Sequence, residues 1–327
     1  MHTDAAAVAA RYARFAREEA PGRSALYGDW AAGVAGDPRL CGILARIPET
    51  RRQPPLVFAV SRLLGAPEEG FAVWADWVSR HADELVAEAS VRSLQTNEPQ
   101  RCAALLPALC LIDGPIALVE LGASAGLCLY PDRYSYRYGS LAVDPVDGVS
   151  PVVLECALSG EPALRMPQIV WRAGIDLTPL DAADAEDRAF LSALVWPGEG
   201  GRRERIDAAL DIAAVDPPVM VAGDASDPAV LAGVIAQAPQ DATLVVTTPG
   251  VLPHIPRAGR ERLLAALAGI DGVWISIDPP GLHDVWRPPV APDWGGFVLG
   301  VGGVPVAAVD PLGAFVEWRA GERGARA

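Results

Sequence analysis

The sequence predicts an α/β protein with a doubly wound, mostly parallel sheet, antiparallel closing strands and a preceding helical region. Three observations carry this prediction. Residues 1–112 show helical periodicity and no convincing strand. After residue 113, short apolar runs alternate with helical stretches. The last apolar runs follow one another without a helix, which favours an antiparallel closure. We therefore expect a helical N-terminal region at 1–112 and an α/β domain at 113–327.

The N-terminal region contains start and stop signals for several helices. Asp37 is suited to cap a helix that begins with Pro38, and Gly65 is suited to end the helix Pro54–Leu64. The other helical stretches are Ala5–Glu19, Glu68–Arg80, Asp83–Leu94 and Pro99–Ile112. Pro107 lies inside the last of these and is expected to kink it.

The apolar runs after residue 113 are typical of strands buried in a parallel sheet. They are Ile116–Leu121, Ile169–Ile175, Val219–Ala222, Thr243–Thr247 and Gly272–Ile277. Helices are expected at Ala185–Leu194, Arg203–Ala214, Ala229–Ala236 and Arg260–Ala268, and closing strands at Gly296–Val301, Val304–Val309 and Ala314–Trp318. We interpret residues 141–167 as an insertion, a hairpin with a strand at Val152–Ala157.

The charge balance excludes several classes of function. The chain has 27 basic and 41 acidic residues, a net charge of −14 and a pI near 4.7, which argues against nucleic acid and anionic lipid as partners. Every basic residue is arginine. The absence of lysine excludes a lysine Schiff base, a pyridoxal-phosphate linkage and a phosphate-loop lysine.

The cysteines and the N-terminus predict a cytoplasmic protein. The five cysteines are odd in number and none forms a C-x-x-C pair, so we expect neither a metal site nor a disulfide framework. They are interpreted as buried small side chains in a reducing compartment. The N-terminus is charged throughout, which predicts an amphipathic helix and no signal peptide, and no apolar run is long enough to predict a membrane span.

The first predicted strand ends in a turn of small residues that could bind a ligand. Glu120 lies at its carboxyl end and is followed by Gly122, Ala123, Ser124 and Gly126. Small residues allow a ligand to approach the backbone, and a helix expected after the turn would offer free N–H donors. Because ligands of open α/β sheets bind at this edge of the sheet, we expect Glu120 and the turn to contact one.

A carboxylate at the end of the second strand is the usual partner of ribose hydroxyls in such folds. Asp176 ends that strand, but it lies 50 residues after Gly126, whereas about 20 is usual. Asp144 has the better spacing and competes for the role. We prefer Asp176 because its strand is longer and its flanking residues fit better, and the inserted residues account for the spacing.

The remaining predicted strands also end in polar or turn residues. Gly223, Asp224 and Ala225 follow the third strand, Thr247 ends the fourth and Asp278 follows the fifth. The carboxyl ends of parallel strands meet at one edge, so these residues are candidates for the same ligand site.

Three of these segments resemble motifs of class I S-adenosylmethionine-dependent methyltransferases. Glu120–Gly126 is similar to the first motif of that family, with Ser124 in place of the middle glycine. Gly174–Pro179 is similar to the second-strand motif, and Gly223–Ala225 is similar to the adenine-side motif. The resemblance implies a Rossmann-like, methyltransferase-type domain, S-adenosylmethionine as cofactor and a small-molecule acceptor. The cofactor-binding residues that it implies are Glu120, Gly122, Ala123, Ser124, Gly126, Asp176, Gly223, Asp224, Ala225 and Thr247.

The chain also resembles, over most of its length, a bacterial family catalogued as a domain of unknown function. The matching segments are Asn97–Ala103, Glu120–Leu127, Asp132–Tyr134, Trp171–Leu177 and Leu194–Pro197. This resemblance implies a fold and no substrate.

Methyl transfer to oxygen or nitrogen often needs a base, and histidine suits that role near neutral pH. His254, just after the fourth strand, is our first candidate. His283 lies on the proline-rich loop Pro279–Gly295, which could cap a small substrate, and Asp278 lies just before that loop. These three residues are the catalytic candidates.

Two other functions remain open. Gly122-x-Ser124-x-Gly126 has the form of a hydrolase nucleophile elbow, with Asp224 or Asp278 and His254 or His283 downstream. Against it, a helical region precedes the turn and no oxyanion loop is visible. The other alternative is a non-catalytic nucleotide-binding protein on the same fold.

Overall fold

The computed structural model describes residues 2–320 and contains two compact units. The first, called here the helical unit, comprises the chain up to Thr96 together with Asp184–Asp207. The second, the sheet unit, comprises Asn97–Ala183 and the chain from Ala208 onward. These limits differ from the predicted boundary at residue 112, because the last N-terminal helix belongs to the sheet unit and a later helix belongs to the helical unit.

The helical unit consists of short helices. They are α1 (His2–Glu18), α2 (Ala25–Gly36), α3 (Pro38–Leu44), the 3₁₀ turn η1 (Glu49–Arg51), α4 (Pro54–Leu63), α5 (Phe71–Arg80), α6 (Ala82–Val91) and α8 (Ala185–Leu194). Asp37 caps α3 as predicted: its carboxylate accepts hydrogen bonds from the backbone N–H groups of Arg39 and Leu40. Helix α2 was not predicted, since glycines interrupt its pattern. At one of them, Gly33, a side chain would collide with the ring of Phe71.

Aromatic side chains form the core of the helical unit. The ring of Phe58 lies within 4.9–6.1 Å of the rings of Tyr12, Phe15, Tyr27, Trp30 and Trp74, measured between centroids. Helix α8 joins this unit through Arg62, which donates hydrogen bonds to the carbonyl of Ala193 in the last turn of α8 at 2.8 Å and to that of Val195, just after the helix, at 2.7 Å. Cations at a helix C-terminus are favourable, so this contact explains the attachment of α8.

The sheet unit is built on a nine-stranded sheet in the order β5-β12-β11-β10-β9-β8-β1-β6-β7. Its parallel strands are β1 (Pro115–Leu121), β6 (Gln168–Asp176), β7 (Val219–Ala222), β8 (Thr243–Pro249) and β9 (Val273–Asp278). The antiparallel strands β10 (Phe297–Val301), β11 (Val304–Val309) and β12 (Phe315–Trp318) follow, and β5 (Ala157–Ser159) lies at the edge. The predicted α/β class, mostly parallel sheet and antiparallel closure are confirmed.

The strand order places a topological switch point between β1 and β8. From β1 the chain proceeds to β6 and β7 on one side, and then returns to β8 and β9 on the other. The crevice outside the carboxyl ends of such strands is where open α/β sheets bind ligands. Glu120 and the turn after β1 lie at this position.

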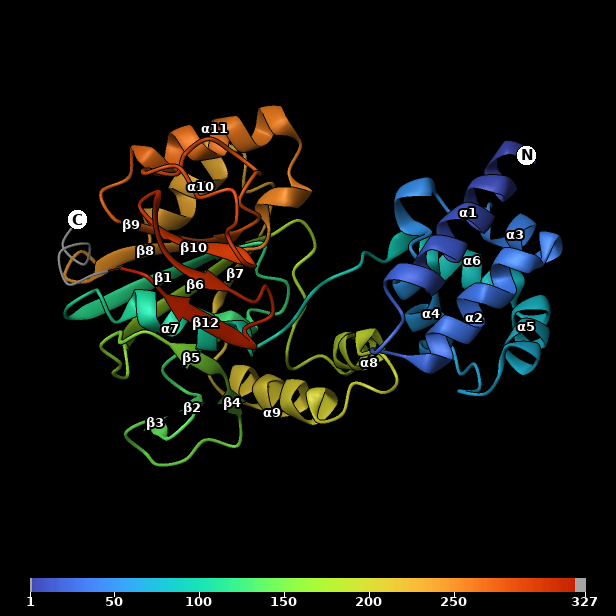
Figure 1. Ribbon diagram of the computed structural model, residues 1–327, viewed down its shortest axis with the longest axis horizontal. Coiled ribbons are helices and arrows are strands. Elements are labelled where there is room, and N and C mark those ends of the chain that lie inside the picture. Colours follow the sequence, from blue (N-terminus) through green and yellow to red (C-terminus); the bar gives the residue numbers. More distant parts are fainter. Residues whose placement is uncertain (1, 321–327) are drawn as a thin grey trace. The chain divides into compact units, whose positions relative to one another are not determined.

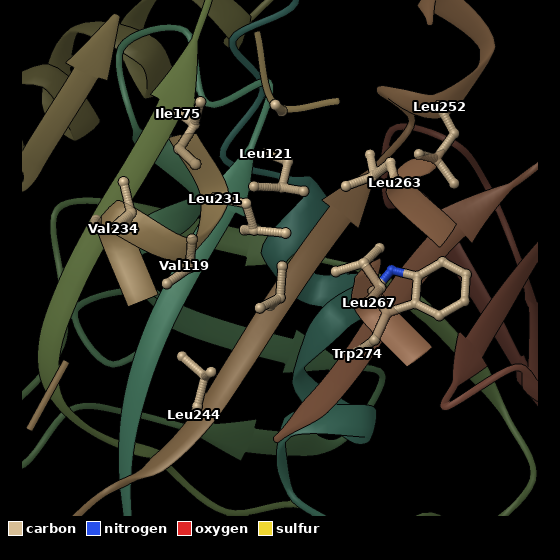
Figure 2. Packing of buried hydrophobic residues seen from close by; sticks show 13 residues of the cluster. Val119, Leu121, Ile175, Leu231, Val234, Leu244, Leu252, Leu263, Leu267 and Trp274 are labelled. Atoms are coloured by element: carbon tan, nitrogen blue, oxygen red, sulfur yellow. The ribbon is translucent and has the colours of Figure 1, made fainter. Parts of the chain in front are cut away.

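Helices cover both faces of the sheet (Figure 1). Helices α10 (Pro228–Ile235) and α11 (Arg257–Ala268) lie on one face, and α7 (Arg101–Leu109) lies on the other, while α9 (Arg202–Val215) leads into β7. Figure 2 shows the core under α10 and α11, where Leu231, Val234, Leu263 and Leu267 meet Val119, Leu121, Ile175, Leu244 and Trp274 of the strands. Burial of these apolar side chains fixes the strand faces, and therefore the residues that remain available at the edge.

Two predictions for the segment after β1 were wrong in part. The turn is followed by a single 3₁₀ turn, η2 (Leu127–Leu129), and not by the expected helix. Pro131 explains this, because it lacks an N–H group and disfavours helical backbone at Tyr130. The insertion is a three-stranded sheet of β2 (Ser135–Tyr138), β3 (Leu141–Val143) and β4 (Val153–Glu155), in which β3 pairs with β2.

Two further observations concern the described chain as a whole. All five cysteines are buried, as predicted, and all five are free thiols. None of the helices in residues 2–320 is long and apolar enough to cross a membrane.

Candidate functional site

The turn after β1 has an unusual backbone. Gly122, Ser124 and Gly126 have φ angles of +74°, +54° and +73°. Ser124 is the only non-glycine residue with positive φ in the part of the chain that the structure describes. Such backbone costs a side-chain-bearing residue on the order of 1 kcal/mol and persists only where the surroundings enforce it. Hydrogen bonds from two other segments do so here.

The first of these segments is the end of β6. The carboxylate of Asp176 accepts one hydrogen bond from the backbone N–H of Ser124 and one from that of Thr178, both at 2.9 Å. The rival candidate Asp144 directly follows β3 of the three-stranded sheet and pairs with Arg137 of β2 at 2.9 Å. Hydrogen bonds from Ser135 and Arg137 lower the pKa of Asp144. The structure therefore brings Asp176, and not Asp144, to the turn.

The second segment precedes α7 and was not among the predicted site residues. The side-chain amide of Asn97 donates to Ser124 Oγ, and its oxygen accepts from the backbone N–H of Ala125 at 2.9 Å. Asn97 is buried. The sequence offered one signal, the segment Asn97–Ala103 that resembles the bacterial family, but no spacing rule connects it with a turn 27 residues away.

Glu120 is the most unusual titratable group at this edge. Its side chain is 3% exposed, and its Oε2 atom is buried without a hydrogen-bond partner. Burial is the main cause that raises the pKa of Glu120 well above its ordinary value. Cys128 and Asp176 raise this pKa further, whereas Arg101 lowers it. Burying an unpartnered carboxyl oxygen is costly, so it needs an explanation in function or in a missing partner.

The glycines of the site are packed against protein. A side chain at Gly122 would collide with Val251, which follows β8. At Gly126, a Cβ atom would lie 3.2 Å from both Leu129 and Pro218. We expected open space for a ligand beside these two glycines. Other side chains of the protein fill the positions that a Cβ atom would take there. A cavity of about 280 Å³ lies next to the turn, lined by Ala125 and by neighbouring residues that include Pro179, Leu180, Ala213, Pro218 and Met220.

The predicted residues after β7 and at the end of β8 have roles within the fold. The backbone N–H of Gly223 donates to the carbonyl of Asp176 at 2.8 Å, and Asp224 accepts from the N–H of Ser226. Ala225 packs in the core cluster. The hydroxyl of Thr247 donates to the carbonyl of Val119 at 3.3 Å inside the sheet.

Asp278 and His283 form a buried pair. His283 Nε2 lies 3.4 Å from Asp278 Oδ2, and the side chains are 5% and 0% exposed. Burial raises the pKa of Asp278, and the hydrogen bond with His283 opposes this rise. Trp286 lies against His283 with ring centroids 4.5 Å apart. Asp278 Oδ1 and His283 Nδ1 are both buried without a partner.

This pair and Glu120 lie on opposite faces of the sheet. Glu120 is paired with Thr247, and Thr247 with Ile275, so these side chains share one face. Trp274 and Asp278 alternate with Ile275 and therefore lie on the other face, where Trp274 joins the core under α10 and α11. The structure brings Glu120, Ser124 and Asp176 together, but it does not bring Asp278 and His283 to the same side.

The third catalytic candidate, His254, lies in the 3₁₀ turn η3 (Leu252–His254) after β8, and its side chain is exposed. Among the described residues, no group of three or more histidine, cysteine, aspartate or glutamate side chains could hold a metal ion.

Comparison with known proteins yields a family and no activity. The model of a family described as "Uncharacterized protein conserved in bacteria (DUF2332)" matches residues 9–318. No curated protein matches the chain, and no solved structure does.

Proposed function

The chain belongs to the bacterial DUF2332 family, and from its geometry we propose that it transfers a methyl group from S-adenosylmethionine to a small-molecule acceptor. One observation carries the proposal: a buried carboxyl oxygen of Glu120 without a partner, at the switch point of a doubly wound sheet. An unpartnered buried polar atom at a ligand-binding edge is best explained by a ligand that supplies the partner.

The surroundings of the turn support a nucleoside ligand. Asp176 accepts two hydrogen bonds but retains further lone pairs that could accept from ribose hydroxyls, and its side chain is partly exposed. The cavity next to Ala125 has mainly apolar walls. Such walls suit a nucleobase, since base rings bury well against apolar side chains.

The residues fit S-adenosylmethionine at some points and not at others. Glu120 fits its ammonium group, and Asp176 fits its ribose. Gly122 offers no room in the direction of its Cβ, since Val251 occupies that space. The cofactor would supply an electrophilic methyl group, and the protein would position it and exclude water.

The proposed acceptor is a small molecule, and a nucleic-acid substrate does not suit a net charge of −14. Among the candidate bases, His254 is the one on an exposed turn directly after β8, the strand next to β1. The side chains of His283 and Asp278 are buried, so we place His254 first in the role of base.

Calorimetry with S-adenosylhomocysteine tests the proposal. We expect binding in the micromolar range and a rise in melting temperature by mass action. Glu120→Gln keeps the shape of the side chain but cannot ionise, so it should weaken binding at least about tenfold. The matched control is Asp144→Asn, directly after β3, which should leave affinity unchanged. Absence of heat and of thermal shift at millimolar ligand would reject the cofactor, and binding without any methyl transfer would favour the non-catalytic alternative.

One observation favours a second candidate, a serine hydrolase. The positive φ of Ser124 is a feature of nucleophile elbows. The hydroxyl accepts a hydrogen bond from Asn97 and is 3% exposed, which does not suit a nucleophile. A fluorophosphonate probe decides: labelling of the wild-type protein that is lost in Ser124→Ala would support the hydrolase.

A further inference from the structure

A second cavity of the sheet unit has no role in the proposed function. Its volume is about 450 Å³. Its walls include Pro145, Val149 and Pro151 from the loop between β3 and β4, and Ile212 and Val215 from the end of α9. All of its lining residues belong to the sheet unit, and none is among the residues assigned to the proposed cofactor.

We propose that this cavity binds a small organic cation, an amine carried on an apolar body. The inference goes beyond the proposed function and does not depend on it. Three observations support it, which are the size and walls of the cavity, the exposure of its apolar side chains and the charge of its lining.

The size and the walls of the cavity favour a small molecule as the occupant. Pockets that bind small ligands typically enclose about 300–1,000 Å³ and are lined mainly by apolar side chains, with a few polar groups that fix the orientation. This cavity lies within that range, and apolar atoms form most of its exposed wall. An apolar ligand body would therefore be removed from water there, which favours binding.

The exposure of two apolar side chains in the lining is the second observation. Val149 and Val215 line the cavity from separate segments and are 66% and 87% exposed. Single exposed valines are ordinary on a protein surface, but apolar side chains that gather around one cavity mark a binding site. The loop that carries Val149 belongs to the three-stranded sheet, which is inserted between β1 and β6 and is separate from the nine-stranded sheet. Loops carried on a rigid scaffold commonly hold binding residues.

The charge of the lining favours a cation. Three aspartates and one arginine line the cavity, which gives the lining a net formal charge of −2: Asp147, Asp211, Asp216 and Arg133. Arg133 is already engaged, because its Nε lies 3.4 Å from Asp132 Oδ2 and its Nη2 lies 3.7 Å from Asp216 Oδ2. An anionic ligand would have to compete with these carboxylates for the arginine, whereas the lining attracts an ammonium group.

Ligand-observed NMR titration with three probes tests the chemical class. Tryptamine has an aromatic body and an ammonium group, indole-3-propionate has the same body with a carboxylate, and ethylamine has the charge without the body. At low salt the wild-type protein should bind tryptamine with a Kd of about 1 mM or below. Indole-3-propionate should bind at least about fivefold more weakly and ethylamine not measurably, since each lacks one of the two matching features. Absence of tryptamine binding, or equal binding of indole-3-propionate, would overturn the inference.

Two valine variants test whether tryptamine binds in this cavity. Val149→Arg places a cationic side chain in the lining and should weaken tryptamine binding at least about tenfold. Val146→Arg is the matched control, since Val146 lies on the same loop and is 98% exposed but does not line the cavity. It should change the Kd less than about twofold. Both positions are exposed, so neither variant should change the melting temperature. Equal effects of the two variants on the Kd would overturn the inference.

Variants of two other lining residues complete the test. Val215→Arg, on α9, should also weaken tryptamine binding at least about tenfold, which excludes a local effect on the loop. Asp147→Asn should reduce the preference for tryptamine over indole-3-propionate about two- to threefold, as should about 0.5 M salt. A preference that neither change alters would overturn the role of the charge.

Sedimentation velocity tests the rival occupant, a second copy of the chain. The wild-type protein and Val149→Arg should sediment alike. A dimer that Val149→Arg dissociates would assign the cavity to the second copy and overturn the inference. The result with S-adenosylhomocysteine decides only the proposed function, so the two can fail separately.

Discussion

Glu120 shows how one residue can link ligand binding to stability. Its carboxyl group is buried at the end of β1 and has an oxygen without a partner. A group of this kind is neutral in the folded state and ionised in the unfolded state over the interval between its two pKa values. The folded protein therefore holds a proton that the unfolded protein has lost.

The sign of the pH dependence follows. Because the folded pKa of Glu120 is raised, its contribution to stability is fully present below the ordinary value of 4.5 and is lost as pH rises through the folded pKa. We expect Glu120→Gln to become increasingly more stable than wild type as pH rises above 4.5, until the folded carboxyl group also ionises. Urea unfolding at several pH values measures this, with the exposed Glu161→Gln as control. A difference that is independent of pH would contradict it.

Asn97 gives a second prediction at this scale. Asn97→Ala removes both hydrogen bonds from its amide to the turn and leaves the N–H of Ala125 unpaired. The free energy of unfolding should fall by about 1–3 kcal/mol. Denaturant titration checks this. The control is Gln237→Ala, which removes an exposed side-chain amide on a surface turn. It should lower the free energy of unfolding by less than about 0.5 kcal/mol.

Asp176 and Asp144 were rival candidates, and binding can now separate them. Asp176→Ala should weaken binding of S-adenosylhomocysteine at least tenfold, because it removes a candidate ribose partner and two bonds that hold the turn. Asp144→Ala should leave affinity unchanged. Calorimetry of both variants decides, and the opposite ranking would assign the ribose role to Asp144.

At the scale of elements, local signals predicted most of the fold. The helix α3 was predicted from its cap at Asp37, and β7 and β11 have the predicted bounds. The helix predicted after the turn was wrong, because the prediction used the small residues of the turn and overlooked Pro131, which ends a helix. Helix α2 was missed because its glycines weaken the helical pattern, although Ser24 at its N-cap was a usable signal.

The contact between the turn and the loop after β8 gives a prediction at this scale. Gly122→Ala places a methyl group against Val251 and on a backbone with φ of +74°. It should destabilise the protein by about 1–3 kcal/mol. Adding Val251→Ala should recover part of this loss, which a double-mutant cycle from urea unfolding measures. If the changes in the free energy of unfolding of the two single variants simply add, the loss in Gly122→Ala comes from the backbone conformation alone and not from contact with Val251.

At the scale of the molecule, the site depends on contacts that no local pattern encodes. The sequence placed Glu120, Ser124 and Asp176 at strand ends, and parallel strands bring such ends to one edge. Asn97 could not be assigned, because its contact with the turn depends on how the segment before α7 packs. Glu120 and Asp278 lie on opposite faces of the sheet because of the strand register, which depends on pairing between distant segments.

The two units share a chain that passes between them more than once. Residues 184–207 lie in the connection from β6 to β7 but belong to the helical unit, where Trp196 packs against Phe15 and Tyr27. During synthesis, the first 96 residues therefore leave the ribosome without part of their core. The missing segment is complete only 111 residues later, at Asp207. At bacterial elongation rates of roughly 5–20 residues per second, the N-terminal helices wait roughly 5–20 s with an exposed aromatic surface. We therefore expect chaperones, which bind exposed apolar surface, to associate with the nascent chain during that interval.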